Sequence, residues 1–295
     1  MSNIRTDLAS ELREESGLGD EDGIREENVN INGVDVKRIE IMNDSAAQKI
    51  GRNKGKYISV NFDGVFTDDN FFDKVCEVVK SELTSLTNFE NKETLVIGLG
   101  NAELTADALG PKTISKVIAS RHLKKHTPEL FNNLKLGEVS TLTTSVLGKT
   151  GIESFELVKA TVEQIQPKVI IVIDALAARE MKRLCTTLQI TDTGICPGSG
   201  VGNNREELSE KTLGITVISI GIPTVVNART LAYDLARENN CEPSEKSLSP
   251  YDENLIVTPK DIDVLLSKCS ALLSVSINKT LHGNLSKDEI NLLSE

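Results

Sequence analysis

Two aspartates stand close behind apolar segments, at positions where reactive side chains gather in α/β proteins. Asp107 follows the apolar segment 94–99 and the sequence GLGN at residues 98–101, and Asp174 directly follows the apolar segment 169–173. The carboxyl ends of parallel strands meet at one edge of a sheet. Two carboxyls brought together there could share a proton and activate a water molecule. We therefore take Asp107 and Asp174 as candidate catalytic residues, although spacing alone leaves open whether their strands are neighbours.

Each aspartate also has an ordinary structural interpretation. Asp107 is followed by a Gly-Pro pair and a predicted helix at residues 114–123, so it could cap a helix or form an Asx turn. Asp174 precedes the segment 175–179, whose composition predicts a helix start, and it could be the N-cap of that helix.

Other kinds of catalytic or cofactor site find little support in the sequence. The three histidines, His122, His126 and His282, do not form a metal-ligand set, and no HExxH, Cys–His or Ser–His motif is present. A dinucleotide-binding fingerprint would need glycine where Glu103 stands. We therefore expect no cofactor and no metal. One alternative remains open, in which Asp107, Asp174 and Glu103 hold a divalent ion that activates water.

A glycine-rich segment at residues 197–205 follows a predicted strand. Its successive amides could bind an anion or an oxyanion, or it could simply form a wall or lid of the site. It lacks the Gly-Lys-Ser/Thr ending of a phosphate-binding loop. A non-enzymatic scaffold that grips an anion with this segment is a second alternative.

The composition predicts a globular protein that does not bind nucleic acid or membranes. The chain has 295 residues, of which 39% are hydrophobic and 26% charged, and its net charge is -11. This charge disfavours binding to nucleic acid and to anionic membranes. No segment has the length and apolarity of a transmembrane helix, and no signal peptide is recognisable. Five widely spaced cysteines without a CxxC pair suggest reduced thiols and a cytoplasmic protein.

Alternating strand and helix patterns predict an α/β fold with a central, largely parallel or mixed sheet covered by helices. The strand segments are continuously apolar, as expected where helices cover both sheet faces. Asn32 and Gly33 between two strand segments predict a hairpin, and hence a small additional β element near the N-terminus. The first 30 residues are polar and predict a mobile or loosely docked arm.

Eight segments resemble the germination protease family of spore-forming bacteria, in the same order along the chain from residue 4 to about residue 265. Several of these segments are long and unusual, so the resemblance is specific. The segments are 4–9 (IRTDLA), 98–101 (GLGN), 107–111 (DALGP), 146–153 (VLGKTGIE), 173–179 (IDALAAR), 189–195 (QITDTGI), 197–204 (PGSGVGNN) and 221–226 (GIPTVV).

The resemblance implies an endopeptidase that degrades small acid-soluble spore proteins in the developing spore or spore core. It also implies an inactive zymogen, typically a homotetramer, that is activated by removal of a short N-terminal piece. The essential aspartates of the family correspond to Asp107 and Asp174. The family fold is similar to that of the hydrogenase-maturation peptidases.

The N-terminal arm resembles the family's substrates, which are cut after an acidic residue and before a hydrophobic residue, Ala, Ser/Thr and Glu. The sequence DLASE begins at Asp7, so we predict self-processing between Asp7 and Leu8. This divides the chain into a propeptide (1–7), a polar arm (8–30) and a single peptidase domain (31–295). Without the resemblance, DLASE would be taken as the start of a polar helix.

Overall fold

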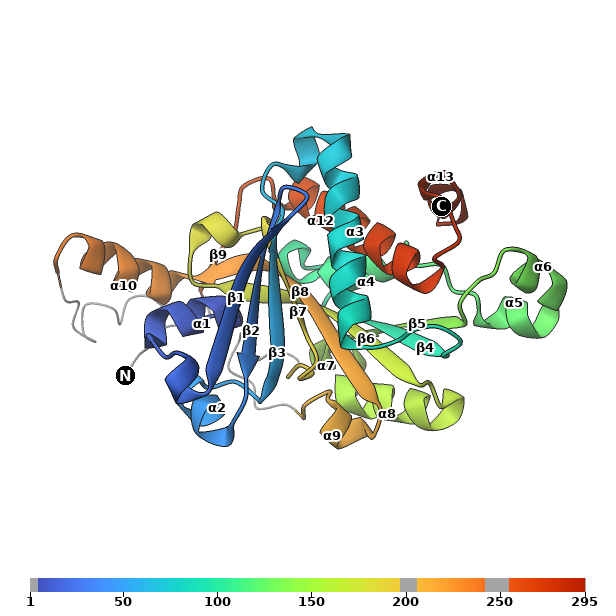
Figure 1. Ribbon diagram of the computed structural model, residues 1–295, viewed down its shortest axis with the longest axis horizontal. Coiled ribbons are helices and arrows are strands. Elements are labelled where there is room, and N and C mark those ends of the chain that lie inside the picture. Colours follow the sequence, from blue (N-terminus) through green and yellow to red (C-terminus); the bar gives the residue numbers. More distant parts are fainter. Residues whose placement is uncertain (1–4, 197–205, 242–254, 295) are drawn as a thin grey trace.

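The protein is an α/β structure built on one mixed sheet with helices on both faces (Figure 1). The computed structural model describes residues 5–196, 206–241 and 255–294. Within these ranges the sheet has nine strands in the order β1-β2-β3-β7-β8-β6-β4-β5, with β9 paired to β8. The predicted fold class is confirmed.

The strands of the sheet are β1 (Ile24–Ile31), β2 (Val34–Ile41), β3 (Gly55–Asn61), β4 (Thr94–Leu99), β5 (Val139–Ser145), β6 (Val169–Ala178), β7 (Thr187–Thr191), β8 (Thr216–Asn227) and β9 (Ile256–Val257).

The helices are α1 (Ala9–Ser16), α2 (Asp44–Ile50), α3 (Asp69–Leu86), α4 (Leu109–Ile114), α5 (Arg121–His126), α6 (Pro128–Asn133), α7 (Leu147–Thr150), α8 (Ser154–Ile165), α9 (Glu210–Leu213), α10 (Ala228–Glu238), α12 (Ile262–Leu281) and α13 (Lys287–Leu293). A short 3₁₀ turn, η3 (Thr105–Asp107), precedes α4.

The sheet has a parallel half and an antiparallel half. Strands β8, β6, β4 and β5 run parallel, whereas β1, β2, β3 and β7 pair antiparallel and join the parallel half at β8. The predicted hairpin is present: Asn32 and Gly33 connect β1 and β2, and both have the positive φ that a type I′ turn requires. This hairpin is the outer edge of the same sheet rather than a separate small one.

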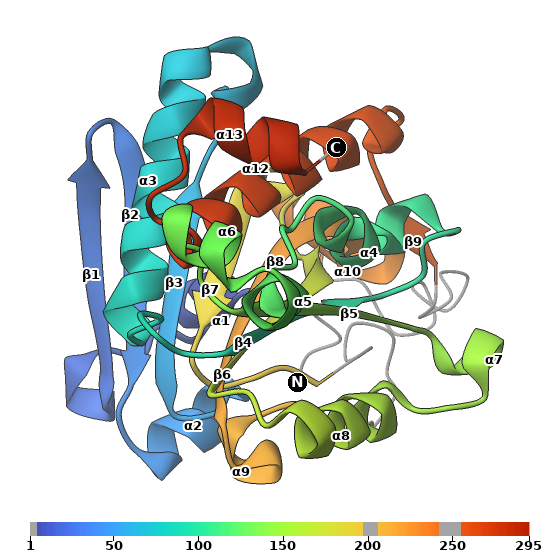
Figure 2. The same cartoon turned by 90° about the vertical axis from the view of Figure 1, so that its right-hand side faces the viewer.

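Two hydrophobic cores lie on opposite faces of the sheet. Helices α3, α4 and α12 pack on one face over alternate residues such as Val96, Ile171 and Ile218. Helix α8 covers the other face over Ile97, Val172 and other residues. Figure 2 shows α12 and α8 on opposite sides of the strands. Burial on both faces explains why the central strands are continuously apolar.

Strand β6 continues past Asp174 to Ala178, so the helix start predicted at residues 175–179 is wrong. The segment pairs with β8 from Asp174 opposite Gly221 to Ala178 opposite Val226. This pairing satisfies backbone groups that a helix would otherwise satisfy internally, and tertiary pairing overrides the local helix preference of the alanines. Asp174 is consequently not a helix N-cap but a residue within a strand.

The single helix predicted at residues 114–123 is also wrong, because α4 ends at Ile114 and α5 begins at Arg121. The intervening backbone is held by α12. The Asn278 side chain accepts a hydrogen bond from Ile118 N (3.0 Å) and donates one to Lys116 O (2.9 Å). The buried ring of His282 also contacts Ile118 O through Nε2 (3.0 Å). These side chains replace the helical hydrogen bonds that the break loses.

The segment 8–30 is packed on the fold rather than loosely docked. Leu8 and Ala9 are fully buried, α1 packs against α2 and the sheet, and Ile24 begins β1. Helix α1 lies against α2 and against strands β2 and β3.

Candidate active site

A cavity of about 840 Å³ lies over the carboxyl ends of the central parallel strands, and Asp107 and Asp174 both line it. Strands β4 and β6 are parallel neighbours, with Gly98 opposite Ile173. Asp174 therefore lies in β6 just past the level at which its pairing with the neighbouring strand β4 ends, and Asp107 lies in the segment that follows β4. The neighbour relation that spacing alone left open is thus settled.

Asp107 is positioned by the GLGN turn at the end of β4. Its carboxylate accepts a hydrogen bond from the backbone amide of Asn101 at 2.7 Å. Gly100 has a φ of 105°, and a Cβ atom at this residue would lie 2.1 Å from the carbonyl oxygen of Asp107. The glycine is therefore required for two reasons, the backbone conformation and the close approach of η3. Asp107 does not directly begin a helix, because Ala108 separates it from α4.

Asp174 is positioned within β6 and is 8% exposed. One of its carboxylate oxygens accepts a hydrogen bond from the following amide, Ala175 N, at 2.9 Å. On the neighbouring strand β8, Gly221 lies opposite Asp174, and Gly221 in turn lies opposite Gln189 of β7.

These three paired residues form a row across the sheet. Directly opposed residues of neighbouring strands have their side chains on the same face, so Gln189 and Asp174 face the same cavity across Gly221. Gly221 has no side chain to fill the space between them. The side chain of Leu176 occupies that space instead, since a Cβ atom on Gly221 would lie 2.4 Å from it.

The predicted processing site, Asp7 and Leu8, also adjoins this cavity. The backbone amide of Asp7 donates to Ala177 O (2.8 Å), and its side chain accepts from Ala177 N (2.8 Å). Leu8 is fully buried in an apolar cluster with Leu176, Ala178, Leu184 and Val226. The segment around Asp7 therefore lies along the C-terminal end of β6, and Asp7 lines the cavity.

Gln189 holds this segment by its backbone. Its side-chain amide donates to Asp7 O (3.0 Å) and its side-chain oxygen accepts from Ala9 N (2.7 Å). The nitrogen and the oxygen of the Gln189 side chain thus bind the backbone on either side of Leu8.

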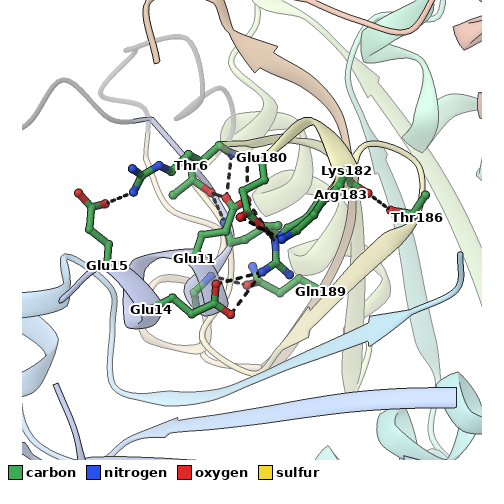
Figure 3. Close-up of polar contacts among 12 residues, drawn as sticks. Thr6, Glu11, Glu14, Glu15, Glu180, Lys182, Arg183, Thr186 and Gln189 are labelled. Atoms are coloured by element: carbon green, nitrogen blue, oxygen red, sulfur yellow. Dashed lines mark hydrogen bonds and ion pairs between the residues drawn. The ribbon is translucent and has the colours of Figure 1, made fainter. Parts of the chain in front are cut away.

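A buried carboxylate, Glu11 of α1, fixes the arm to the segment after β6 (Figure 3). It accepts hydrogen bonds from Arg179 N (2.8 Å), Glu180 N (3.0 Å) and the hydroxyl of Thr6, and it pairs with the Arg183 guanidinium (3.3 Å). Burial raises the pKa of Glu11 above its ordinary value of 4.5, and the hydrogen bonds and Arg183 oppose this shift.

The residues proposed for the metal alternative do not form a ligand set. The carboxylate of Glu103 is 77% exposed and pairs with Lys149. Within residues 5–196, 206–241 and 255–294, no three His, Cys, Asp or Glu side chains lie close enough to hold a metal ion. The glycine-rich segment of the scaffold alternative, residues 197–205, lies outside the described residues.

Sequence reasoning missed two residues that contact the Asp7 segment, Arg52 in the turn after α2 and Gln189 in β7. Neither belongs to a chemical motif. The only signal was that Gln189 opens the segment 189–195 that resembles the family, and Arg52 had none.

Thr224 of β8 also supports the site, because its hydroxyl donates to Ala106 O at 2.6 Å and so ties η3 to the sheet.

Comparison with proteins of known sequence gives matches over nearly the whole chain. The chain is 37% identical to the germination proteases of Caldanaerobacter subterraneus subsp. tengcongensis and Clostridium acetobutylicum, over 98% or 99% of both partners in each pair. It is 34% identical to the germination protease of Bacillus velezensis, over 97% of this chain and 95% of that protein.

Among solved structures, the nickel–iron hydrogenase maturation protease HycI of Thermococcus kodakarensis matches with a TM-score of 0.34 and 15% identity. The match covers 66% of this chain and 98% of that one. No helix in the described part of the chain is long and apolar enough to cross a membrane.

A family model described as germination protease matches residues 4–237. With this match and relatives of 37% identity along almost its full length, the chain belongs to the germination protease family and is a protease.

Proposed function

We propose that this protease is an endopeptidase that degrades small acid-soluble spore proteins, with Asp107 and Asp174 activating the water that attacks the peptide bond. The observation that carries this proposal is that both aspartates line one cavity, Asp174 from β6 and Asp107 from η3, which follows the adjacent parallel strand β4. Membership of the germination protease family supports the substrate class and the spore location.

The proposed reaction is hydrolysis without a covalent intermediate. One aspartate, ionised, takes a proton from water, while the other, protonated, donates a hydrogen bond to the scissile carbonyl and then its proton to the tetrahedral oxygen. Two coupled carboxyls titrate as a pair, so the acid and base roles belong to the pair rather than to a named residue.

Replacing either aspartate by asparagine tests the mechanism. Each proton-transfer role is worth about 10²–10⁴-fold in rate. We expect Asp107→Asn and Asp174→Asn to lower kcat/KM on a purified spore protein by at least 100-fold, with the thermal unfolding midpoint nearly unchanged. Asp35→Asn, on the exposed hairpin edge, is the matched control. Activity of either site variant near that of the wild type would refute the aspartate pair.

We further propose that the protein is made as a zymogen and processes itself between Asp7 and Leu8. The docked arm supports this, because Asp7 lines the cavity and Leu8 is buried beside it, so the segment occupies space that a substrate would need. N-terminal sequencing of the active enzyme should begin at Leu8. Another first residue in the active form contradicts the assignment of this bond.

The proposed assembly is a homotetramer, as the family resemblance implies. Light scattering coupled to size-exclusion chromatography measures the mass of the assembly directly, and a monomer of 32.1 kDa would contradict it.

A further inference from the structure

The Asp7 carboxylate contacts a backbone hydrogen-bond donor and lies within ion-pair distance of a guanidinium. One oxygen accepts a hydrogen bond from the backbone amide of Ala177 at 2.8 Å. The other lies 3.7 Å from a terminal nitrogen of the Arg52 guanidinium. The side chains of Asp7 and Arg52 are only 14% and 25% exposed, so solvent screens their attraction less than it would at the surface.

Arg52 directs its polar contacts at the segment that the proposed cleavage would remove. The same terminal nitrogen donates a hydrogen bond to Thr6 O at 2.7 Å. The Nε atom of Arg52 is buried and has no hydrogen-bond partner among the described residues. The Arg52 guanidinium thus contacts residues 6 and 7 and has one further buried hydrogen-bond donor, Nε. It could bind another chain once cleavage has released those residues.

The backbone of Asp7 is held in register with this side-chain site. Its amide donates to Ala177 O, and its carbonyl accepts from the Gln189 side chain. Gln189 faces the same side of the sheet as Asp174, two strands away across Gly221. The Asp7 carbonyl is therefore bound by Gln189, which lies in the same row across the sheet as Asp174, a proposed catalytic residue.

We infer that Arg52 and the amide of Ala177 form the subsite that selects an acidic residue on the amino side of the bond to be cut. Asp7 of the chain itself fills this subsite before processing, and an aspartate of a protein substrate takes its place afterwards. Gln189 is the positioning residue that holds the backbone at that subsite. This inference rests on the proposed endopeptidase function, and it adds the residues that determine which bond is chosen.

Two peptides that compete in one reaction test the subsite. Both copy residues 3–12 of this chain, and they differ only in having Asp or Asn at the place of Asp7. The full-length protein, activated by its own processing, is given equal amounts of both peptides, and mass spectrometry gives the ratio of their kcat/KM values. Because both peptides meet the same enzyme molecules, the ratio does not depend on how much of each preparation is active.

The wild type is expected to favour the Asp peptide by about 10- to 100-fold, the range for one charge-assisted contact in a partly buried site. Arg52→Gln is expected to lower this preference below about 3-fold, by slowing cleavage of the Asp peptide while that of the Asn peptide stays nearly constant. A purely structural role would slow both peptides alike. Arg25→Gln is the matched control, because Arg25 pairs with Glu40 at the exposed edge of the sheet.

Arg52→Lys keeps the positive charge and is expected to keep most of the preference. An unchanged preference for the Asp peptide in Arg52→Gln overturns the inference. Equal cleavage of the two peptides by Arg52→Lys also overturns it. If Arg52→Gln is inactive, the result with Arg52→Lys decides the test. If the wild type cuts both peptides equally, the subsite is refuted and the endopeptidase proposal stands. If it cuts neither peptide, the subsite and the proposed processing bond are both refuted.

Discussion

The proposed role of Asp107 depends on the close approach that Gly100 permits, so Gly100→Ala provides a sensitive test. A Cβ atom at residue 100 would lie 2.1 Å from the Asp107 carbonyl oxygen, whereas ordinary contacts begin at 3.4 Å. The turn that carries Asp107 must therefore move by about 1 Å, a displacement that can cost about 100-fold in rate.

The backbone strain of this substitution must be separated from its effect on the site. Alanine at a φ of 105° adds about 1–3 kcal/mol of strain, which lowers stability without touching chemistry. Gly33→Ala is the matched control. Gly33 has a φ of 94° in the hairpin turn, and a Cβ atom there would meet nothing within 4 Å.

The assay compares kcat/KM on a spore protein and urea unfolding for the two variants. We expect both to lose stability through backbone strain, Gly100→Ala more because of its added clash, and only Gly100→Ala to lose about 100-fold in kcat/KM, equivalent to about 2.7 kcal/mol. Wild-type activity in a folded Gly100→Ala protein would show that the position of Asp107 does not matter, and would refute the reasoning.

Three further predictions concern the arm and the buried titratable groups. Because burial raises the pKa of Glu11, the folded protein binds more protons than the unfolded chain between pH 4.5 and the raised value. The free energy of unfolding should therefore fall as pH rises through this window, by at most about 1.4 kcal/mol per pH unit relative to Glu11→Gln, and a constant difference in urea titrations would contradict this. Burial lowers the pKa of His282. The contribution of His282 to the free energy of unfolding should therefore be complete above pH 6.5 and should be lost as pH falls through the lowered pKa. His282→Asn should remove this acid sensitivity in the same titrations. Leu8→Ala should weaken arm docking by about 2–5 kcal/mol, seen as faster hydrogen exchange in α1, and unchanged exchange would argue against the buried contact.

Local sequence patterns were sufficient to predict the elements whose conformation is determined by neighbouring residues. The alternating segments around Asn32 and Gly33 predicted the hairpin, because Asn-Gly favours the two positive φ values of a type I′ turn, which joins such strands in two residues. The apolar segments 94–99 and 169–173 predicted β4 and the first half of β6.

Local patterns failed where distant partners satisfy the backbone. The alanines after Asp174 favour a helix in isolation, but β8 offers them a continuous set of strand hydrogen bonds. In the same way, Asn278 and His282 of α12 take over the hydrogen bonds of the break between α4 and α5.

The residue types of the candidate site were readable from the chain, since Asp107 follows an apolar segment and GLGN, and Asp174 directly follows a second apolar segment. Their meeting in one cavity was not, because strand order in a sheet depends on how distant segments pack and is not encoded in spacing. Arg52 and Gln189 show the same limit. An arginine in a turn and a glutamine in a strand have no functional pattern of their own, and their role appears only when the folded chain brings Asp7 against them.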